Sequence, residues 1–105
     1  MIIHHVFFWL KNSSSVDDRQ KLIEGLETLE QISSVRKLYI GLPAATEDRS
    51  VVDSSYSVSE LMHFSDLEGQ KLYQDDPIHK KFIEKCSHLW ERVLVYDVDV
   101  TNQEV

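Results

Sequence analysis

The stretch Ile2–Lys11, IIHHVFFWLK, decides the fold of this chain of 105 residues. Its β-branched and aromatic side chains favour a strand, in which successive side chains point to opposite faces. One face carries His4, Val6, Phe8 and Leu10, and the other carries Ile3, His5, Phe7 and Trp9. Because both faces are largely apolar, both need to be covered by other parts of the fold.

Helical and strand periodicities alternate along the rest of the chain. Helices are expected over residues 16–32, 65–74 and 77–92, and strands over residues 2–11, 34–42, 55–64 and 93–100. Helix-start signals stand at Ser15, at the pair Ser65 and Glu68, and at Asp76 followed by Pro77. The order β-α-β-β-α-α-β predicts an α+β, ferredoxin-like fold: a four-stranded antiparallel sheet with all helices on one face.

Helices on one face leave the other face of the sheet bare. A bare apolar face of several hundred Å² is a liability in a monomer, so a second copy is the expected cover. We therefore expect a homodimer through the sheet face, made by Ile3, His5, Phe7, Trp9, Val93 and Val95. Residues 1–100 are expected to form a single domain, followed by a disordered polar tail at residues 101–105.

Composition excludes several classes of partner. The formal net charge of −7 argues against binding to nucleic acid or to an anionic membrane surface. One cysteine allows no internal disulfide, and no signal peptide or apolar run of about 20 residues is present, which favours the cytoplasm. Neither a phosphate loop nor a dinucleotide fingerprint occurs, so no cofactor is expected; no histidine pair has the spacing of helical metal ligands, so no metal site is expected either.

His79 is the most informative candidate for chemistry. At about 100° per residue it lies within the apolar stripe of the helix over 77–92, so its imidazole points inward. The favoured interpretation is a core histidine near a helix start; a pocket acid or base is the alternative, and a metal ligand is a third. Tyr73 precedes it by six residues. Its phenol is either a buried, tethered aromatic or a donor to a ligand's carbonyl oxygen while His79 moves a proton.

His4 and Glu60 are weaker candidates. A lone histidine among apolar neighbours is more often a core residue than a catalyst, and this is the favoured interpretation of His4. Glu60 shares a strand face with Val58, Met62 and Phe64. If it is buried, its carboxylate is a candidate base with a perturbed pKa. If its strand is an edge or bends, Glu60 is solvated, and the solvated interpretation is favoured.

Three segments together resemble the stress-responsive A/B barrel (Dabb) domain family: HHVFFWLK near the start, Tyr73-x-x-x-Pro77-x-His79, and the closing VLVYDVDV. The likeness spans Met1 to about Val100. It implies a dimeric α+β barrel of two ferredoxin-like sheets packed face to face. Some plant members of the family are similar to polyketide cyclases, and their pocket residues fall here on Tyr73, His79 and His4. Those cyclases carry a third-strand histidine where this chain has Val58, so a cyclase-type site is incomplete.

Two functions follow as expectations. The first is a protein that binds a small apolar or aromatic molecule near Tyr73 and His79 without turnover. The second is a cofactor-free enzyme that performs acid/base chemistry, cyclase-like or monooxygenase-like, on an aromatic or polyketide-type carbonyl compound. In both, the candidate catalytic residues are His79, Tyr73 and His4. The expected ligand-binding residues are Val6, Phe8, Val58, Glu60 and Phe82.

Overall fold

The computed structural model describes residues 1–102; residues 103–105, in the predicted tail, lie outside the described part. Its elements in chain order are β1 (Ile2–Leu10), α1 (Val16–Glu27), the 3-10 helix η1 (Thr28–Gln31), β2 (Lys37–Gly41), β3 (Val58–Phe64), α2 (Leu67–Asp75), α3 (Pro77–Cys86), the 3-10 helix η2 (Ser87–Leu89) and β4 (Trp90–Asp99).

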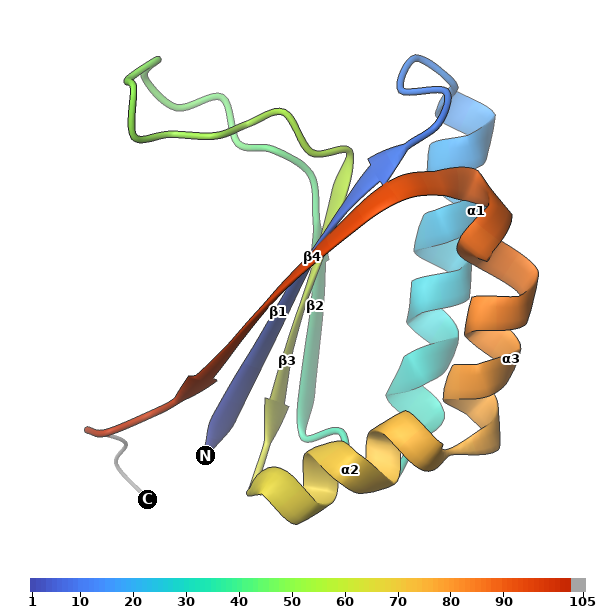
Figure 1. Ribbon diagram of the computed structural model, residues 1–105, viewed down its shortest axis with the longest axis vertical. Helices are drawn as coiled ribbons and strands as arrows, with labels where there is room; N and C mark the ends of the chain where they lie inside the picture. Colours follow the sequence, from blue (N-terminus) through green and yellow to red (C-terminus); the bar gives the residue numbers. More distant parts are fainter. Residues whose placement is uncertain (103–105) are drawn as a thin grey trace.

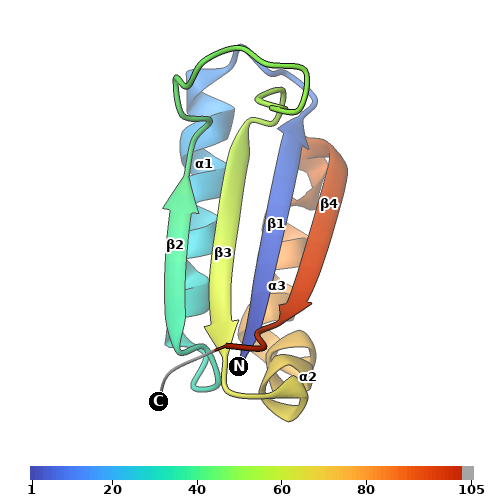
Figure 2. The ribbon, with the colours of Figure 1, turned by 90° about the vertical axis from the view of Figure 1, so that its left-hand side faces the viewer.

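The four strands form one antiparallel sheet in the order β2-β3-β1-β4. All the helices lie against one face, which leaves the other face free of helices (Figures 1 and 2). This arrangement confirms the predicted α+β, ferredoxin-like fold. The central position of β1 explains why both of its faces are apolar: one packs on helices, and the other is the uncovered face.

The core forms between the helices and the alternate residues of the central strands. Every second residue of β1, from Ile2 to Leu10, is buried, as the alternation predicted. Leu22 and Leu26 of α1 pack onto this face and are fully buried. Burying such side chains stabilises the fold by roughly 1.5–3 kcal/mol each.

Two of the three predicted helix starts are confirmed, and one is wrong by a residue. The Ser15 hydroxyl accepts a hydrogen bond from the Asp18 amide, and the Asp76 carboxylate accepts one from the Ile78 amide. Helix α2 is capped by Asp66 instead of Ser65, through a 2.8 Å hydrogen bond from the Gly69 amide. A carboxylate is a stronger acceptor at the positive end of a helix than a hydroxyl.

Several predicted boundaries differ from the structure. The α-helical part of α1 ends at Glu27, and α3 ends at Cys86; each continues as a 3-10 turn. Strand β4 begins at Trp90, whereas the sequence predicted helix to residue 92. Trp90 pairs with Leu10 beside a β-bulge in which Glu91 of β4 is the extra residue, and this long-range pairing overrides the local helical pattern. Strands β2 and β3 are shorter than predicted, although the Arg36 amide still donates to His63 and the Ser57 amide to Phe8 just before each strand begins.

The predicted orientation of β4 is wrong. In the antiparallel register Val95 lies across from Val6, and Val93 lies across from Phe8. Paired residues share a face, so Val93 and Val95 are on the helix side of the sheet. The β4 residues that share the uncovered face with Ile3, His5 and Phe7 are Val98, Tyr96 and Leu94.

Candidate functional site

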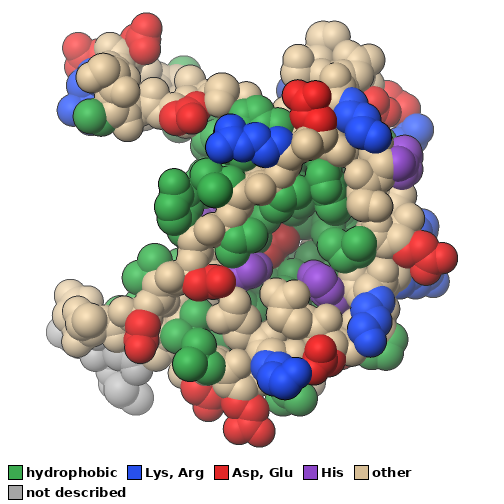
Figure 3. Space-filling view, in the orientation of Figure 1, with side chains coloured by type: hydrophobic (Ala, Val, Ile, Leu, Met, Phe, Trp, Pro, Cys, Tyr) green, Lys and Arg blue, Asp and Glu red, His purple; other side chains and the backbone are tan. Residues whose placement is uncertain are grey.

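A hollow opens on the helix side of the sheet, between β4 and the helices α2 and α3. Val93 and Val95 are on the helix side, yet they remain 39% and 43% exposed. The helices therefore do not cover the edge strand. Figure 3 shows the hollow, with histidine and acidic side chains inside it and apolar side chains around it. Sites of this kind, largely apolar with a few convergent polar groups, are typical of small-molecule binding.

His4 is buried beside this hollow and held by a carboxylate. Its Nδ1 atom lies 2.6 Å from Oδ1 of Asp97, which is across the ladder on β4. The amide of Gln70 on α2 donates to the same Asp97 oxygen at 3.0 Å. Because the Asp97 carboxylate accepts from Nδ1, that nitrogen carries a proton, and Nε2 is the acceptor of the ring in its neutral form.

Tyr73 connects the two candidate histidines. Its ring centroid is 5.8 Å from that of His4 and 4.6 Å from that of His79, both in edge-to-face arrangements. Burial raises the pKa of Tyr73 far above its ordinary value, and the charge of Glu60 acts in the same direction. The phenol is thus neutral and can donate a hydrogen bond.

His79 lies at the start of α3 and is half-buried. Burial lowers its pKa below 6.5, and the neighbouring His4 lowers it further, whereas the Gln74 backbone and Asp76 oppose the shift. The ring is therefore neutral at pH 7. The structure brings His4, Tyr73 and His79 into one cluster, as the family resemblance implied.

Glu60 is buried, so the expectation of a solvated carboxylate is wrong. Its strand β3 is not an edge but lies between β2 and β1, and the side chain is 1% exposed. Burial raises the pKa of Glu60 to about 8. Its Oε1 atom has no hydrogen-bond partner among residues 1–102 and lies 4.0 Å from Nε2 of His4.

The other expected ligand-binding residues, Val6, Phe8, Val58 and Phe82, are all buried in the core cluster. Phe8 and Phe82 meet with ring centroids 6.4 Å apart, and both contact Trp90. They form an apolar side of the same core that holds Glu60 and His4. Sequence reasoning missed Asp97 and Gln70; the only signal was that Asp97 breaks the apolar pattern of the last strand.

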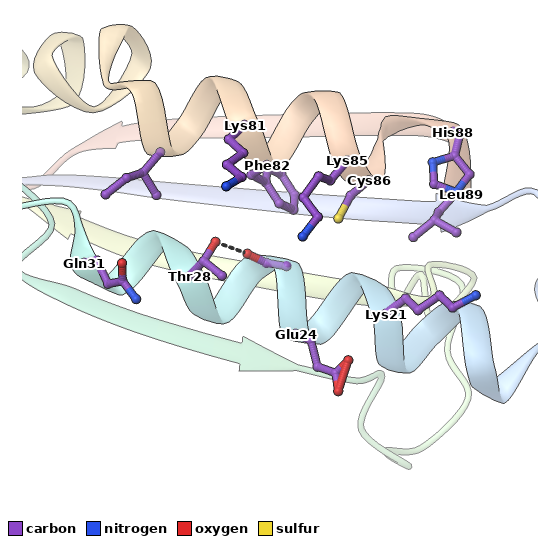
Figure 4. A pocket seen from close by; sticks show the side chains of 12 residues that line it. Lys21, Glu24, Thr28, Gln31, Lys81, Phe82, Lys85, Cys86, His88 and Leu89 are labelled. Atoms are coloured by element: carbon purple, nitrogen blue, oxygen red, sulfur yellow. Dashed lines mark hydrogen bonds between the residues drawn. The ribbon is translucent and has the colours of Figure 1, made fainter.

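A separate groove of about 580 Å³ lies between α1 and α3. Lys81 and Lys85 extend from α3 towards α1 along it (Figure 4), with Phe82 also in its lining. Glu60, His4, Tyr73 and His79 are not among its lining residues. Its one thiol, Cys86, has a pKa raised by burial, so it is neutral and a poor nucleophile. The two large pKa shifts, those of Glu60 and Tyr73, belong to the cluster beside the hollow, and we take the hollow as the candidate site.

Within residues 1–102, no group of three or more histidine, cysteine, aspartate or glutamate side chains is placed to hold a metal ion. In the same described range, no helix is both long enough and apolar enough to cross a membrane.

Comparison with solved structures finds the same fold in other organisms. A protein from Arabidopsis thaliana is 19% identical, with a TM-score of 0.79 over 100% of both chains. A hydroxynitrile lyase from Passiflora edulis is 16% identical, with a TM-score of 0.79 over 99% of this chain and 96% of that one. A dimeric ferredoxin-like protein of unknown function from Thermobifida fusca is 17% identical, with a TM-score of 0.75 over 94% and 90% of the two chains.

At these identities the structural likenesses show the fold and not the activity. No curated protein matches the chain in sequence. The model of the stress responsive A/B barrel domain, Dabb, matches residues 2–100. The chain therefore belongs to the stress responsive A/B barrel domain family.

Proposed function

We propose that the hollow binds a small, mostly apolar molecule that carries an oxygen function, close to Tyr73 and His79. The observation that carries this proposal is the uncovered helix-side face of β4 next to a cluster of neutral polar groups. Its apolar wall includes Val93 and Val95, which a ligand would remove from water. The Tyr73 phenol and the His79 ring, both neutral at pH 7, suit an uncharged carbonyl compound.

The test is an NMR titration of the His79 ring between pH 4 and 8, with and without acetophenone, with His79→Asn used for assignment. We expect a midpoint below 6.5 and a further shift of the resonance on addition of acetophenone. Lys80→Asn, one residue away and exposed, is the matched control and should leave the ligand response unchanged. A His79 ring that ignores acetophenone at every pH contradicts the proposal.

A second candidate is acid/base turnover, and it is favoured by the 2.6 Å contact between Asp97 and His4. A base oriented by a third group is the arrangement used to move protons in enzymes. In this function Tyr73 donates a hydrogen bond to the carbonyl oxygen, and His79 takes a proton from the adjacent carbon, which leaves an enolate stabilised by Tyr73. His4, held by Asp97, is the second group that moves protons.

This second candidate is tested by deuterium incorporation into the methyl group of acetophenone in D₂O. General acid/base catalysis contributes roughly 10²–10⁴-fold in rate. We expect wild-type protein to exceed the buffer rate, and His79→Asn to lose the excess, while Lys80→Asn retains it. If acetophenone binds but wild-type protein exchanges no faster than buffer, the binding function stands without turnover.

We further propose that the uncovered sheet face pairs with a second copy to form a dimeric barrel. This face carries Phe7 and Trp9 of β1, together with Tyr96 of β4, which is 56% exposed. The loop over residues 42–57 and the end of β4 project on the same side (Figure 1), so they frame the face. Sedimentation equilibrium of the wild-type chain should give twice the chain mass at micromolar concentration, and a monomer there would contradict the pairing.

A further inference from the structure

Glu60 is a buried polar group that the proposed function does not use. Its side chain is 1% exposed, and Oε1 has no hydrogen-bond partner in the described part of the chain. Leaving a buried polar atom unpaired costs about 1–3 kcal/mol, so such atoms in native proteins call for a functional explanation. Nε2 of His4 lies 4.0 Å from this oxygen.

The distance between these two atoms matches one bridging oxygen. A separation of 4.0 Å is too long for a direct hydrogen bond. It is shorter than twice an ordinary hydrogen-bond length of about 2.8 Å, so one oxygen can lie within bonding distance of both atoms. Since Asp97 occupies Nδ1 of His4, the free Nε2 accepts a proton from that oxygen.

The surrounding groups keep Glu60 in its neutral form at pH 7. Around Glu60 and His4 lie Tyr73 and Gln70 on α2, which are uncharged, His79 on α3, whose pKa is lowered, and Asp97 on β4, which is itself acidic and accepts from Nδ1 of His4. Burial without a compensating cation raises the pKa of Glu60 to about 8. The protonated carboxyl is a hydrogen-bond donor, so the two sides of the gap are a donor and an acceptor.

We propose that Glu60 and His4 together hold the hydroxyl group of an uncharged ligand, with Glu60 donating to its oxygen and Nε2 of His4 accepting its proton. This inference rests on the proposed binding function and adds the ligand class: a small apolar alcohol or phenol that also carries a carbonyl. A ketone oxygen accepts from Glu60 but leaves Nε2 unpaired. A carboxylate brings a second negative charge beside Asp97, which is unfavourable in a buried site.

The test compares two probes, α-hydroxyacetophenone and acetophenone, by calorimetric titration against wild-type protein, Glu60→Gln and Glu60→Leu. At pH 6.5 we expect wild-type protein to bind the hydroxy compound roughly tenfold or more tightly than acetophenone, because two hydrogen bonds depend on the hydroxyl. Glu60→Leu should lose this preference and still bind acetophenone. Glu60→Gln, which keeps a donor, should retain the preference.

The same comparison at pH 9 tests whether the preference depends on the proton of Glu60 or only on the shape of its side chain. Ionised Glu60 can accept from the hydroxyl but can no longer donate to it, so the wild-type preference should change between pH 6.5 and 9, whereas Glu60→Gln, which cannot ionise, should keep the same preference at both pH values. This arm needs no apolar substitution, so it decides the matter even if Glu60→Leu does not fold.

The possible failures are distinguishable. If wild-type protein binds both probes equally, the hydroxyl site is wrong and the binding function stands. If it binds neither, the binding function fails and this inference fails with it. A preference that is unchanged in Glu60→Leu also overturns the role of Glu60.

Discussion

Asp97 on the edge strand β4 lies directly across the ladder from His4 on β1, with 2.6 Å between Oδ1 and Nδ1. The pair connects a half-exposed carboxylate to a buried imidazole. It orients the ring so that Nε2 points at Glu60. Strand β4, whose helix-side face borders the open hollow, therefore also supplies the carboxylate that holds His4.

Asp97→Ala should lower the free energy of unfolding by about 1–2 kcal/mol, because the buried Nδ1 loses its charged acceptor. Urea unfolding measures this change. Asp99→Ala is the matched control, since Asp99 is on the same strand and face and is exposed, with no side-chain hydrogen bond recorded in the described residues. Equal losses in the two variants would show that the His4 contact contributes nothing measurable.

Adjacent residues of β4 should affect assembly differently. Tyr96→Asp places a charge on the uncovered face and should give a monomer, whereas Val95→Asp faces the hollow and should leave the dimer intact. Both side chains are about half exposed, so general solubility effects are matched. Sedimentation velocity distinguishes the two results. If Val95→Asp dissociates the dimer and Tyr96→Asp does not, the interface does not lie on the uncovered face.

Because of Glu60, the free energy of unfolding should decrease as pH rises. Below about 4.5 both folded and unfolded chains hold the proton, so its stabilising contribution is fully present. Between 4.5 and about 8 only the folded state holds it, and that contribution is progressively lost. The loss over this window is on the order of 3–5 kcal/mol.

The measurement is the difference in unfolding free energy between wild-type protein and Glu60→Gln at several pH values, which cancels the other titrating groups. The difference should move in favour of Glu60→Gln as pH increases, and then level off above pH 8. A difference that stays constant from pH 4.5 to 8 would show that the folded state ionises normally.

Gly25 marks the closest approach of α1 to α3. A Cβ at this position would lie 2.5 Å from Sγ of Cys86 and 3.2 Å from the Phe82 ring. Gly25→Ala should therefore destabilise the fold by about 1–3 kcal/mol, although alanine favours helix. Thermal unfolding measures the loss, and Cys86→Ala should restore part of it in the double variant. Additive losses would show that the thiol is not the obstacle.

Local sequence patterns predicted most of the secondary structure and the residues on each face of β1. His4, Tyr73 and His79 were recognised from the motif that the family resemblance supplied, and the structure places them in contact. Asp97 was missed because nothing near it in the sequence indicates a partner 93 residues away. Such pairs depend on strand register, which local periodicity does not contain.

The sequence by itself determined the element order, the helix caps at Ser15 and Asp76, and the two-sided β1, because these depend on residues close together in the chain. The face of β4 that meets the helices could not be read from the strand, since both of its faces carry apolar residues and the pairing with β1 sets the choice. Only the tertiary structure decided the burial of Glu60. A carboxylate loses its water when strands and helices distant in sequence enclose it, and no local pattern records that enclosure.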